Sequence, residues 1–232
     1  MKVAVLSDIH GNYDAFNEVL KKAEQEGVKH LLILGDIVGY YYSPQKILKS
    51  LSDWSFDMIK GNHEDILGSL ISNPSLRESI RLKYGSGHQY AIDKLDNKTI
   101  KSLISLPSKK TVIIEGVSFE LNHGTPWDPD EYLYPDTNIE KLKQCNSIVH
   151  DFVLMGHTHY SFTYQCEHSI IINPGSVGQS REKGGYAYWA LINTEDKSYN
   201  VKSTKYDIAS LLQEIKNIDP SINYNSKILK RE

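Results

Sequence analysis

Three features are scarce in this sequence of 232 residues, and each scarcity excludes a class of protein. It has only two cysteines, Cys145 and Cys166, without CxxC spacing, so a disulfide framework is not expected. It has no apolar run long enough to cross a membrane, and the N-terminal MKVAVLSDIHGN lacks a small-residue cleavage site. The net charge is −3, so no strong electrostatic field draws the protein to nucleic acid or an anionic membrane. We therefore expect a cytoplasmic protein with neither of these partners.

The remaining composition is typical of a globular domain. Hydrophobic residues make up 40% and charged residues 24% of the chain. This length is sufficient to bury a sizeable core. Because no internal repeat, linker or low-complexity block interrupts the sequence, we expect a single domain over residues 1–232. No pattern in the sequence indicates an oligomeric state.

The first part of the chain alternates between two hydrophobic patterns. Residues 2–8, 30–36 and 56–62 are short apolar runs typical of buried strands. Residues 12–27 and 43–53 between them show helical periodicity, with Asn12 and Ser43 as candidate N-caps. This alternation predicts parallel strands in an α/β layer. Residues 63–106 are predicted to be mainly helical, with breaks near 73–74 and 85–87.

After Pro107 the sequence changes to short strands separated by turn signals. A helix is predicted over 137–144 and another over 207–217, and the last dozen residues, 221–232, are expected to be frayed. The predicted strands lie at 111–116, 117–124, 151–157, 162–167, 169–176, 185–193 and 199–206.

Five predicted strands are followed by polar residues, each group beside a glycine. In open α/β sheets ligands bind beyond the carboxyl ends of the strands, so these side chains should converge on one edge. A lone Asp, Asn or His at a strand end is usually a cap or a surface residue. That explanation would have to hold separately at all five places, which disfavours it. The residues are Asp8, His10, Asp36, Asn62, His63, His123, His157 and His159.

The residue types in this group indicate a metal centre. Carboxylates, imidazoles and one amide, without thiolates, suit Mn²⁺, Fe, Zn²⁺, Co²⁺ or Ni²⁺. The seven candidates that remain when His63 is set aside are too many for one catalytic ion with an open position. They suit two ions about 3.5–4 Å apart that clamp a phosphoryl group and generate hydroxide from a bridging water. We expect two divalent ions, with Mn²⁺ as the leading candidate.

The ordered motifs DxH, GD, GNH[ED], H and GHxH, spread over residues 8–159, resemble those of the calcineurin-like metallophosphoesterases. NPGSVGQSR at 173–181 is similar to the segment that follows GHxH in the small bacterial and archaeal branch. The resemblance implies an α/β (α+β) fold, a four-layer αββα sandwich in which two facing mixed sheets are flanked by helices.

The resemblance also implies a role for each motif residue. Asp36 would bridge the two metals, and His63 would act near the phosphate by protonating the leaving group or stabilising transition-state charge. His157 and His159 would point to the same side of an extended segment, since side chains there repeat every two residues, and Thr158 would face away. One metal would be held by Asp8, His10, Asp36 and His159, and the other by Asp36, Asn62, His123 and His157.

The second motif departs from that of the phosphoprotein phosphatases in this superfamily. They carry GDxVDRG, whereas this chain reads GDIVGYYYSP. Gly39 therefore replaces an aspartate that would partner the catalytic histidine, and a residue of the tyrosine run that follows replaces an arginine suited to phosphate. These losses weaken a Ser/Thr phosphatase interpretation without excluding it.

The candidate substrate contacts are Asn62, Arg181 and Tyr40. One residue of the run Tyr40–Tyr42 could stack on a nucleobase or aryl leaving group, or all three could pack against the following helix. Arg181 could contact phosphate or be an ordinary surface arginine. Loops 39–44 and 124–136 are expected to shape the substrate site, Glu64 to support it or start a helix, and His30, His88, His150 and His168 to be structural.

Several functions remain open at this point. The leading hypothesis is a dinuclear metal-dependent phosphoesterase acting on phosphodiester or nucleotide-type substrates, dinucleoside polyphosphates and cyclic nucleotides among them. Phosphomonoesterase or Ser/Thr protein phosphatase activity is the alternative. A non-catalytic metal-binding scaffold, like the retromer subunit with this fold, is disfavoured because His63 is present. A nuclease is disfavoured because the chain is short and mildly acidic.

Overall fold

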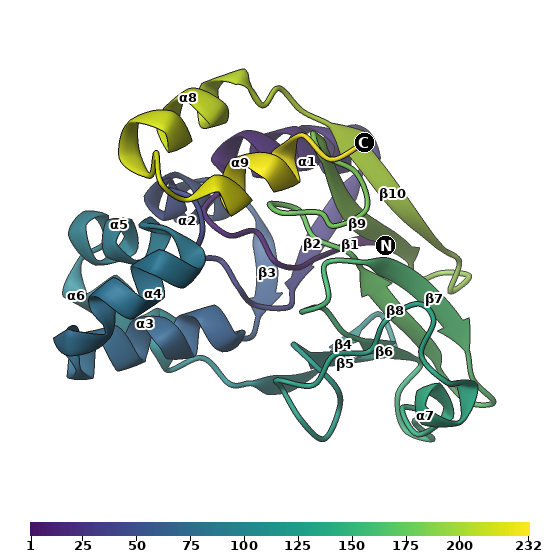
Figure 1. Ribbon diagram of the computed structural model, residues 1–232. Helices are drawn as coiled ribbons and strands as arrows, with labels where there is room; N and C mark the ends of the chain where they lie inside the picture. Colours follow the sequence, from purple (N-terminus) through teal and green to yellow (C-terminus); the bar gives the residue numbers. More distant parts are fainter.

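The computed structural model describes residues 1–232 and contains ten strands, nine α-helices and one short 3₁₀ helix (Figure 1). The strands are β1 Lys2–Leu6, β2 Val28–Ile33, β3 Ser55–Met58, β4 Lys109–Ile114, β5 Val117–Asn122, β6 Phe152–Leu154, β7 Ser161–Gln165, β8 Ile170–Pro174, β9 Tyr186–Asn193 and β10 Tyr199–Lys205. The helices are α1 Tyr13–Gln25, α2 Pro44–Leu51, α3 Asn62–Ser72, η1 Pro74–Leu76, α4 Arg77–Tyr84, α5 Gly87–Lys94, α6 Asn97–Ile104, α7 Ile139–Lys143, α8 Ala209–Ile218 and α9 Asn223–Leu229.

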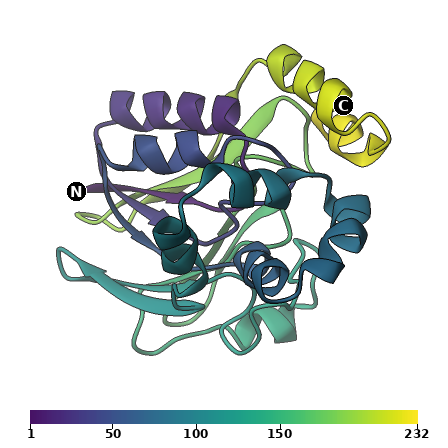
Figure 2. The same ribbon diagram turned by 90° about the vertical axis from the view of Figure 1, so that its left-hand side faces the viewer.

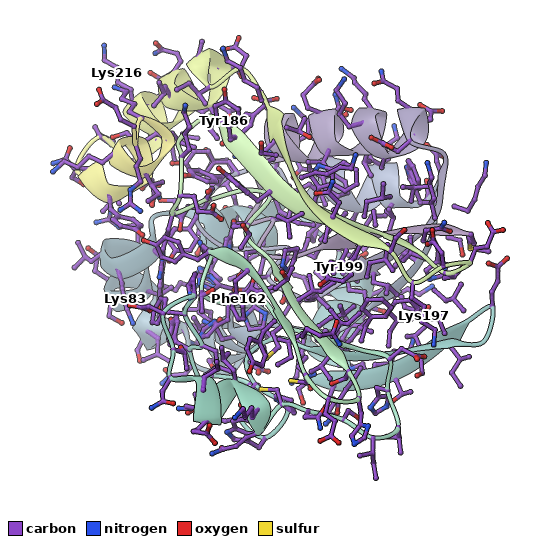
Figure 3. The ribbon with its side chains drawn as sticks, turned by 90° about the vertical axis from the view of Figure 1, so that its right-hand side faces the viewer. Lys83, Phe162, Tyr186, Lys197, Tyr199 and Lys216 are labelled. Carbon is purple, nitrogen blue, oxygen red and sulfur yellow. The ribbon has the colours of Figure 1, made fainter.

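The strands form two mixed sheets of five strands each, with orders β10-β9-β1-β2-β3 and β4-β5-β6-β8-β7. As the sequence predicts, β1, β2 and β3 are parallel, while β9 and β10 add antiparallel neighbours. In the second sheet β5, β6 and β8 are parallel and the outer strands are antiparallel. Figure 3 shows the sheets from the side, with Tyr199 on β10 and Phe162 on β7.

The side-chain alternation of β1 shows how the layers are built. Val3 and Val5 point into the core between the sheets, together with Phe119 of β5. Ala4 and Leu6 point to the opposite face, where helices cover the first sheet. Figure 2 shows α1 and α2 side by side over that face. On the outer face of the second sheet α7 and the segments around it provide a thin cover, so the αββα sandwich implied by the motifs is confirmed.

The predicted helix starts and breaks are confirmed, except that one of the two N-cap candidates makes no capping hydrogen bond. The side chain of Asn12 accepts a hydrogen bond from the amide of Ala15, which starts α1. Pro44 occupies the first turn of α2, although the Ser43 side chain makes no capping bond. The predicted breaks at 73–74 and 85–87 separate α3, α4 and α5. No helix is both long and apolar enough to span a membrane, and Cys145 and Cys166 are buried and unbonded.

The expectation of a frayed C-terminus is wrong. Residues 223–229 form α9, and Ile222, Ile228 and Leu229 are buried. Asn225 is also buried, and its carbonyl oxygen accepts a hydrogen bond from the Tyr41 hydroxyl. The apolar residues are anchored against the core by sequence-distant partners, which a local reading of a short polar tail does not reveal.

Candidate metal-binding active site

The polar strand ends come together at one edge of the sandwich. Three groups of residues have ligand atoms that all lie within 4.8 Å of one another, the spacing needed to hold a metal ion. Asp36 belongs to two of the groups, as does His10, so the groups form one continuous cluster. They are Asp8–His10–His159, His10–Asp36–His63 and Asp36–His123–His157.

The backbone around the cluster is unusually strained. Six of the eight non-glycine residues with left-handed backbone lie here, each at a cost of order 1–3 kcal/mol. Such conformations persist where the surrounding structure fixes them, and they are concentrated at functional sites. The six are Asp8, His10, Asp36, Tyr40, His157 and His159.

Backbone carbonyls fix the orientation of three histidines. Nδ1 of His10 lies 3.1 Å from the Val38 carbonyl, Nδ1 of His123 lies 2.7 Å from that of Leu34, and Nδ1 of His159 lies 2.8 Å from that of Gln179. A carbonyl only accepts, so each Nδ1 carries the proton. The lone pair of a neutral ring is then on Nε2, where a metal is bound. In His10 and His159 these Nε2 atoms face each other at 3.1 Å.

The carboxylates lie between these rings. Asp36 Oδ2 is 3.7 Å from His10 Nε2 and 3.3 Å from His123 Nε2, while its Oδ1 accepts from the amide of His63. Asp8 Oδ1 is buried and accepts no hydrogen bond, with His159 Nε2 at 3.2 Å. Buried carboxylate and imidazole lone pairs without proton donors fit a divalent cation.

The histidines of the cluster differ in their protonation states. Burial lowers the pKa of His10 to about 4, and it also lowers the pKa of His157. Burial alone would lower the pKa of His123 as well, but the Asp36 carboxylate outweighs it and raises that pKa to about 10. Around neutral pH His10 and His157 are therefore neutral rings, whereas His123 must lose a proton before it can bind a metal.

Glu64 holds two of the loops together. Its buried carboxylate accepts hydrogen bonds from the backbone amides of Asp36, Ile37, Val38 and Gly61. The loop after β2 and the start of α3 are thereby fixed to each other. A side chain at Gly61 would collide with Asp36 and His123, which explains the glycine at this point of the motif. Glu64 thus combines the supporting and helix-starting roles expected for it.

The geometry predicted for His157 and His159 is wrong in one respect. Both have left-handed backbone, with φ of 67° and 62°, so the segment between them is not extended. The two rings nevertheless reach different groups, because His157 Nδ1 lies 3.1 Å from His123 Nε2 and His159 lies against His10. Thr158 does face away, with its hydroxyl 3.0 Å from Asn173 Nδ2.

The segment NPGSVGQ supports this cluster from behind. The Ser176 hydroxyl donates to the Asp8 carbonyl, and the amide of Gly178 donates to the same oxygen. The Gln179 carbonyl orients His159, as described above. The sequence indicates only that this segment resembles one in related proteins. In the structure its hydrogen bonds hold the backbone of Asp8 and the ring of His159 in place.

His63 is surrounded mainly by aromatic rings, and no carboxylate makes a hydrogen bond to its imidazole. Its ring centroid lies 5.0 Å from those of Tyr40 and His88 and 4.8 Å from that of Tyr84. A Cβ at position 39 would overlap His63 Nδ1, so the missing aspartate could not be accommodated with this ring position. His88, expected to be only structural, stacks on His63, and nothing in its sequence spacing indicates this.

The tyrosine run is mostly structural. Tyr41 is fully buried, and the Tyr42 hydroxyl donates to Asp219, so neither is available to a substrate. Their rings belong to the core cluster that also contains Ile47 and Leu51 of the following helix α2, in line with the packing alternative, and their hydroxyls bond the C-terminal segment. Tyr40 is 6% exposed and contacts His10 and His63.

More exposed aromatic rings border the cluster from other segments. Tyr132, in the loop expected to shape the site, lies with its ring centroid 4.0 Å from that of His157. Tyr224 of α9 lies 6.3 Å from Tyr40, centroid to centroid. Arg181 lies next to His159, because the Arg181 amide donates a hydrogen bond to the His159 carbonyl. The buried Nε of Arg181 has no hydrogen-bond partner. Asn62 Oδ1 is 3.1 Å from His123 Nε2.

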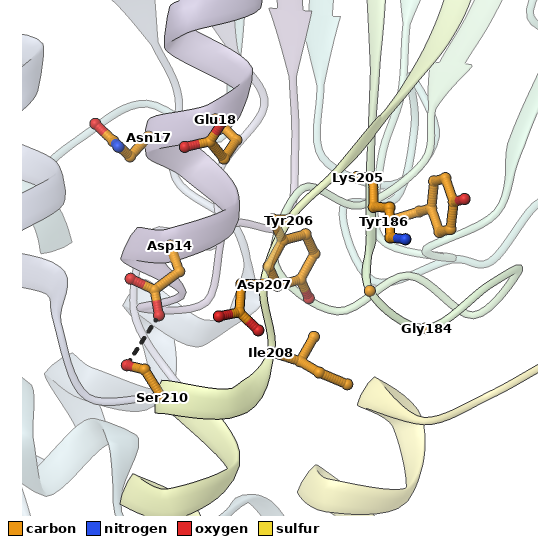
Figure 4. A pocket seen from close by; sticks show the side chains of 11 residues that line it. Asp14, Asn17, Glu18, Gly184, Tyr186, Lys205, Tyr206, Asp207, Ile208 and Ser210 are labelled. Carbon is orange, nitrogen blue, oxygen red and sulfur yellow. Dashed lines mark hydrogen bonds between the residues drawn. The ribbon is translucent and has the colours of Figure 1, made fainter.

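A cavity of about 730 Å³ lies elsewhere, between α1 and the turn from β10 to α8 (Figure 4). Its lining includes Asp14, Glu18, Lys205 and Asp207 but none of the motif residues. The Ser210 hydroxyl donates a hydrogen bond to the Asp14 carboxylate across this cavity. No imidazole faces this cavity, so its size does not make it the site of the metal chemistry.

The chain resembles known proteins over most of its length. Residues 1–197 match the family model of the calcineurin-like phosphoesterase superfamily domain. The chain belongs to this superfamily of metal-dependent phosphoesterases. It is 30% identical to the uncharacterized protein MJ0912 of Methanocaldococcus jannaschii, over 92% of this chain and 91% of that protein.

Two further known proteins are similar to this chain, one in sequence and one in fold. The chain is 26% identical to phosphodiesterase YfcE of Escherichia coli K12, over 80% of this chain and 83% of YfcE. The fold matches a metallophosphoesterase from Sphaerobacter thermophilus with a TM-score of 0.79 at 23% identity, covering 98% of this chain and 99% of that one. Members of the superfamily bind divalent metals, and the Asp and His groups here are able to hold them.

Proposed function

We propose that this protein is a dinuclear metal-dependent phosphoesterase that hydrolyses small phosphodiester or nucleotide-type substrates. The observation that carries the proposal is the position of Asp36, whose Oδ2 lies between His10 Nε2 and His123 Nε2 at 3.7 and 3.3 Å. A carboxylate between two imidazole groups is suited to bridge two ions. We further propose that residues 1–232 act as one domain, because Tyr224 of α9 lies beside Tyr40 at the site. A cytoplasmic location is part of the proposal.

The ligands would fall into two sets that share Asp36. Asp8, His10 and His159 would complete one set, and Asn62, His123 and His157 the other. Two divalent ions, with Mn²⁺ the leading candidate, would supply Lewis-acid stabilisation of the phosphoryl oxygens and an activated water. The carbonyl-bound Nδ1 atoms of His10, His123 and His159 keep each Nε2 directed at the centre.

His63 would act on the leaving group. Its amide is anchored on Asp36 Oδ1 and its ring lies within reach of His10 and Asp36, but we assign it to neither ligand set. Burial lowers its pKa well below the usual value, so the ring is neutral before substrate binds. It would therefore assist by hydrogen bonding and charge stabilisation near the leaving oxygen, or by passing on a proton acquired with the substrate.

The surroundings favour small esters with an aromatic or nucleoside group. Arg181 is the nearby cation suited to a phosphate oxygen, and Tyr132 and Tyr224 offer partly exposed rings. The relative YfcE is named a phosphodiesterase, which supports a diester preference. Gly39 removes the carboxylate partner of the catalytic histidine, which argues against a protein phosphatase.

The test is ester hydrolysis by metal-stripped protein titrated with Mn²⁺. Bis-p-nitrophenyl phosphate and p-nitrophenyl phosphate report diester and monoester cleavage, and His63→Ala and Asp36→Ala are compared with the exposed control His168→Ala. We expect turnover to return with Mn²⁺, the diester to be preferred, and only the first two variants to lose about 10²-fold or more. Monoester preference would favour the phosphatase alternative, and metal binding without turnover would favour the scaffold.

A further inference from the structure

His88 lies in the first turn of α5 and is buried, with 1% of its surface exposed. Its ring is stacked on that of His63, with centroids 5.0 Å apart and planes at 10°. Neither of its ring nitrogens has a hydrogen-bond partner. The ring of His88 therefore contacts its surroundings through its face and not through its nitrogens.

His63 has no polar group that fixes its ring. Its Nδ1 is buried without a partner, and Gly39 occupies the adjacent position where no side chain can be accommodated. The ring is instead confined by its neighbours: His88 stacks on it, Tyr84 meets it at 69°, and Tyr40 lies at 30° to it. Packing therefore has to supply the orientation that a hydrogen bond would otherwise give.

The turn that carries His88 is itself firmly anchored. The amide and hydroxyl of Ser86 both donate to the buried carboxylate of Asp219, at 2.8 and 2.7 Å. Gly87 packs so closely on the backbone of Gly39 and Tyr40 that a Cβ would collide with it. The position of His88 relative to His63 is thus fixed from two sides, by the C-terminal segment and by the loop after β2.

We propose that His88 is a positioning residue whose stacked ring holds His63 in the orientation needed at the leaving group. It takes over, by packing, the orienting role of the carboxylate that position 39 lacks. This role requires a flat ring at position 88, and it does not require hydrogen bonds from the two ring nitrogens.

The kinetic test rests on the proposed esterase function. We expect His88→Ala to lower kcat roughly ten- to a hundredfold with KM and metal content unchanged. His88→Phe should restore most of kcat because it keeps a flat ring, and His88→Leu should not. In a His63→Ala background His88→Ala should have no further effect. An equal loss in that background, or equal rescue by Leu, would overturn the proposal.

A second readout needs no activity. The chain has nine histidines, so ring signals of a histidine-labelled sample can be resolved by NMR and that of His63 assigned with His63→Ala. In the Zn²⁺-loaded protein His88→Ala should shift and broaden the His63 signals, while His88→Phe and the exposed control His168→Ala should leave them sharp. Unchanged His63 signals in His88→Ala would refute the positioning role, even if the wild type hydrolyses no ester.

Discussion

Gly39 and His63 are in such close contact that a Cβ on the glycine would overlap Nδ1 of the imidazole. Gly39 also has left-handed backbone, with φ of 88°. There is no room for a side chain at position 39, so any substitution must displace the His63 ring or the loop that carries Gly39.

The first prediction follows from this contact. Gly39→Ala should lower kcat roughly tenfold or more while metal binding persists, because His63 is displaced and the metal ligands are not. Gly116→Ala is the matched control, since Gly116 also has left-handed backbone, φ 81°, but nothing within 4 Å of a Cβ. Gly116→Ala should therefore introduce the same backbone strain without a steric clash. Equal activity of the two variants would contradict the account.

A second prediction concerns Glu64. Glu64→Ala removes the side chain that accepts hydrogen bonds from four backbone amides, so the free energy of unfolding should fall by about 3 kcal/mol and activity should fall with it. Burial raises the pKa of Glu64 to about 7, so the stability that this group contributes is lost as the pH rises through that value, and urea unfolding should be measured near pH 5. Asp65→Asn, which removes only an exposed ion pair with Lys60, should change stability by less than about 1 kcal/mol.

A third prediction concerns pH and metal affinity. The Asp36 carboxylate outweighs burial and raises the pKa of His123 to about 10, so at neutral pH this ring must release its proton on binding metal. Mn²⁺ affinity should rise with pH between about pH 6 and 9, with roughly one proton released per chain near neutrality. Calorimetry in buffers of different ionisation enthalpy measures this proton. Affinity that falls with rising pH would contradict the assignment of His123 as a ligand.

A fourth prediction concerns the C-terminal helix. Deletion of residues 221–232 removes three buried apolar side chains, Ile222, Ile228 and Leu229, and should lower the free energy of unfolding by about 4 kcal/mol. It also removes the Asn225 carbonyl that binds Tyr41. Deletion of the exposed Glu232 alone is the control. A full truncation with an unchanged unfolding midpoint would show that α9 does not contribute to the core.

The sequence predicted the features that repeat locally. The alternation of apolar runs and amphipathic helices placed the parallel strands β1–β3, and the polar residues after each strand indicated where a site would form. The structure brings Asp8, His10, Asp36, His123, His157 and His159 together at that edge.

Features that depend on partners distant in sequence could not be predicted. The stacking of His88 on His63 joins residues of different helices, and burial of α9 depends on Tyr41 and on core contacts nearly the whole chain away. The left-handed backbone of His157 and His159 arises from tertiary packing, so a period-two argument gave the wrong local geometry. Tyr132 and Tyr224 likewise reach the cluster only through the folding of their loop and helix.

The central claim, that Asp36 joins two ions in one centre, is tested most directly by Mn²⁺ stoichiometry with electron paramagnetic resonance. Metal-free protein should take up about two Mn²⁺ per chain with an exchange-coupled spectrum, as expected for ions about 3.5–4 Å apart. Asp36→Asn should lose the coupling and at least one ion, while Asp57→Asn, at a carboxylate paired with Lys110 and His30, should keep both. A single uncoupled Mn²⁺ in the wild type would contradict the account.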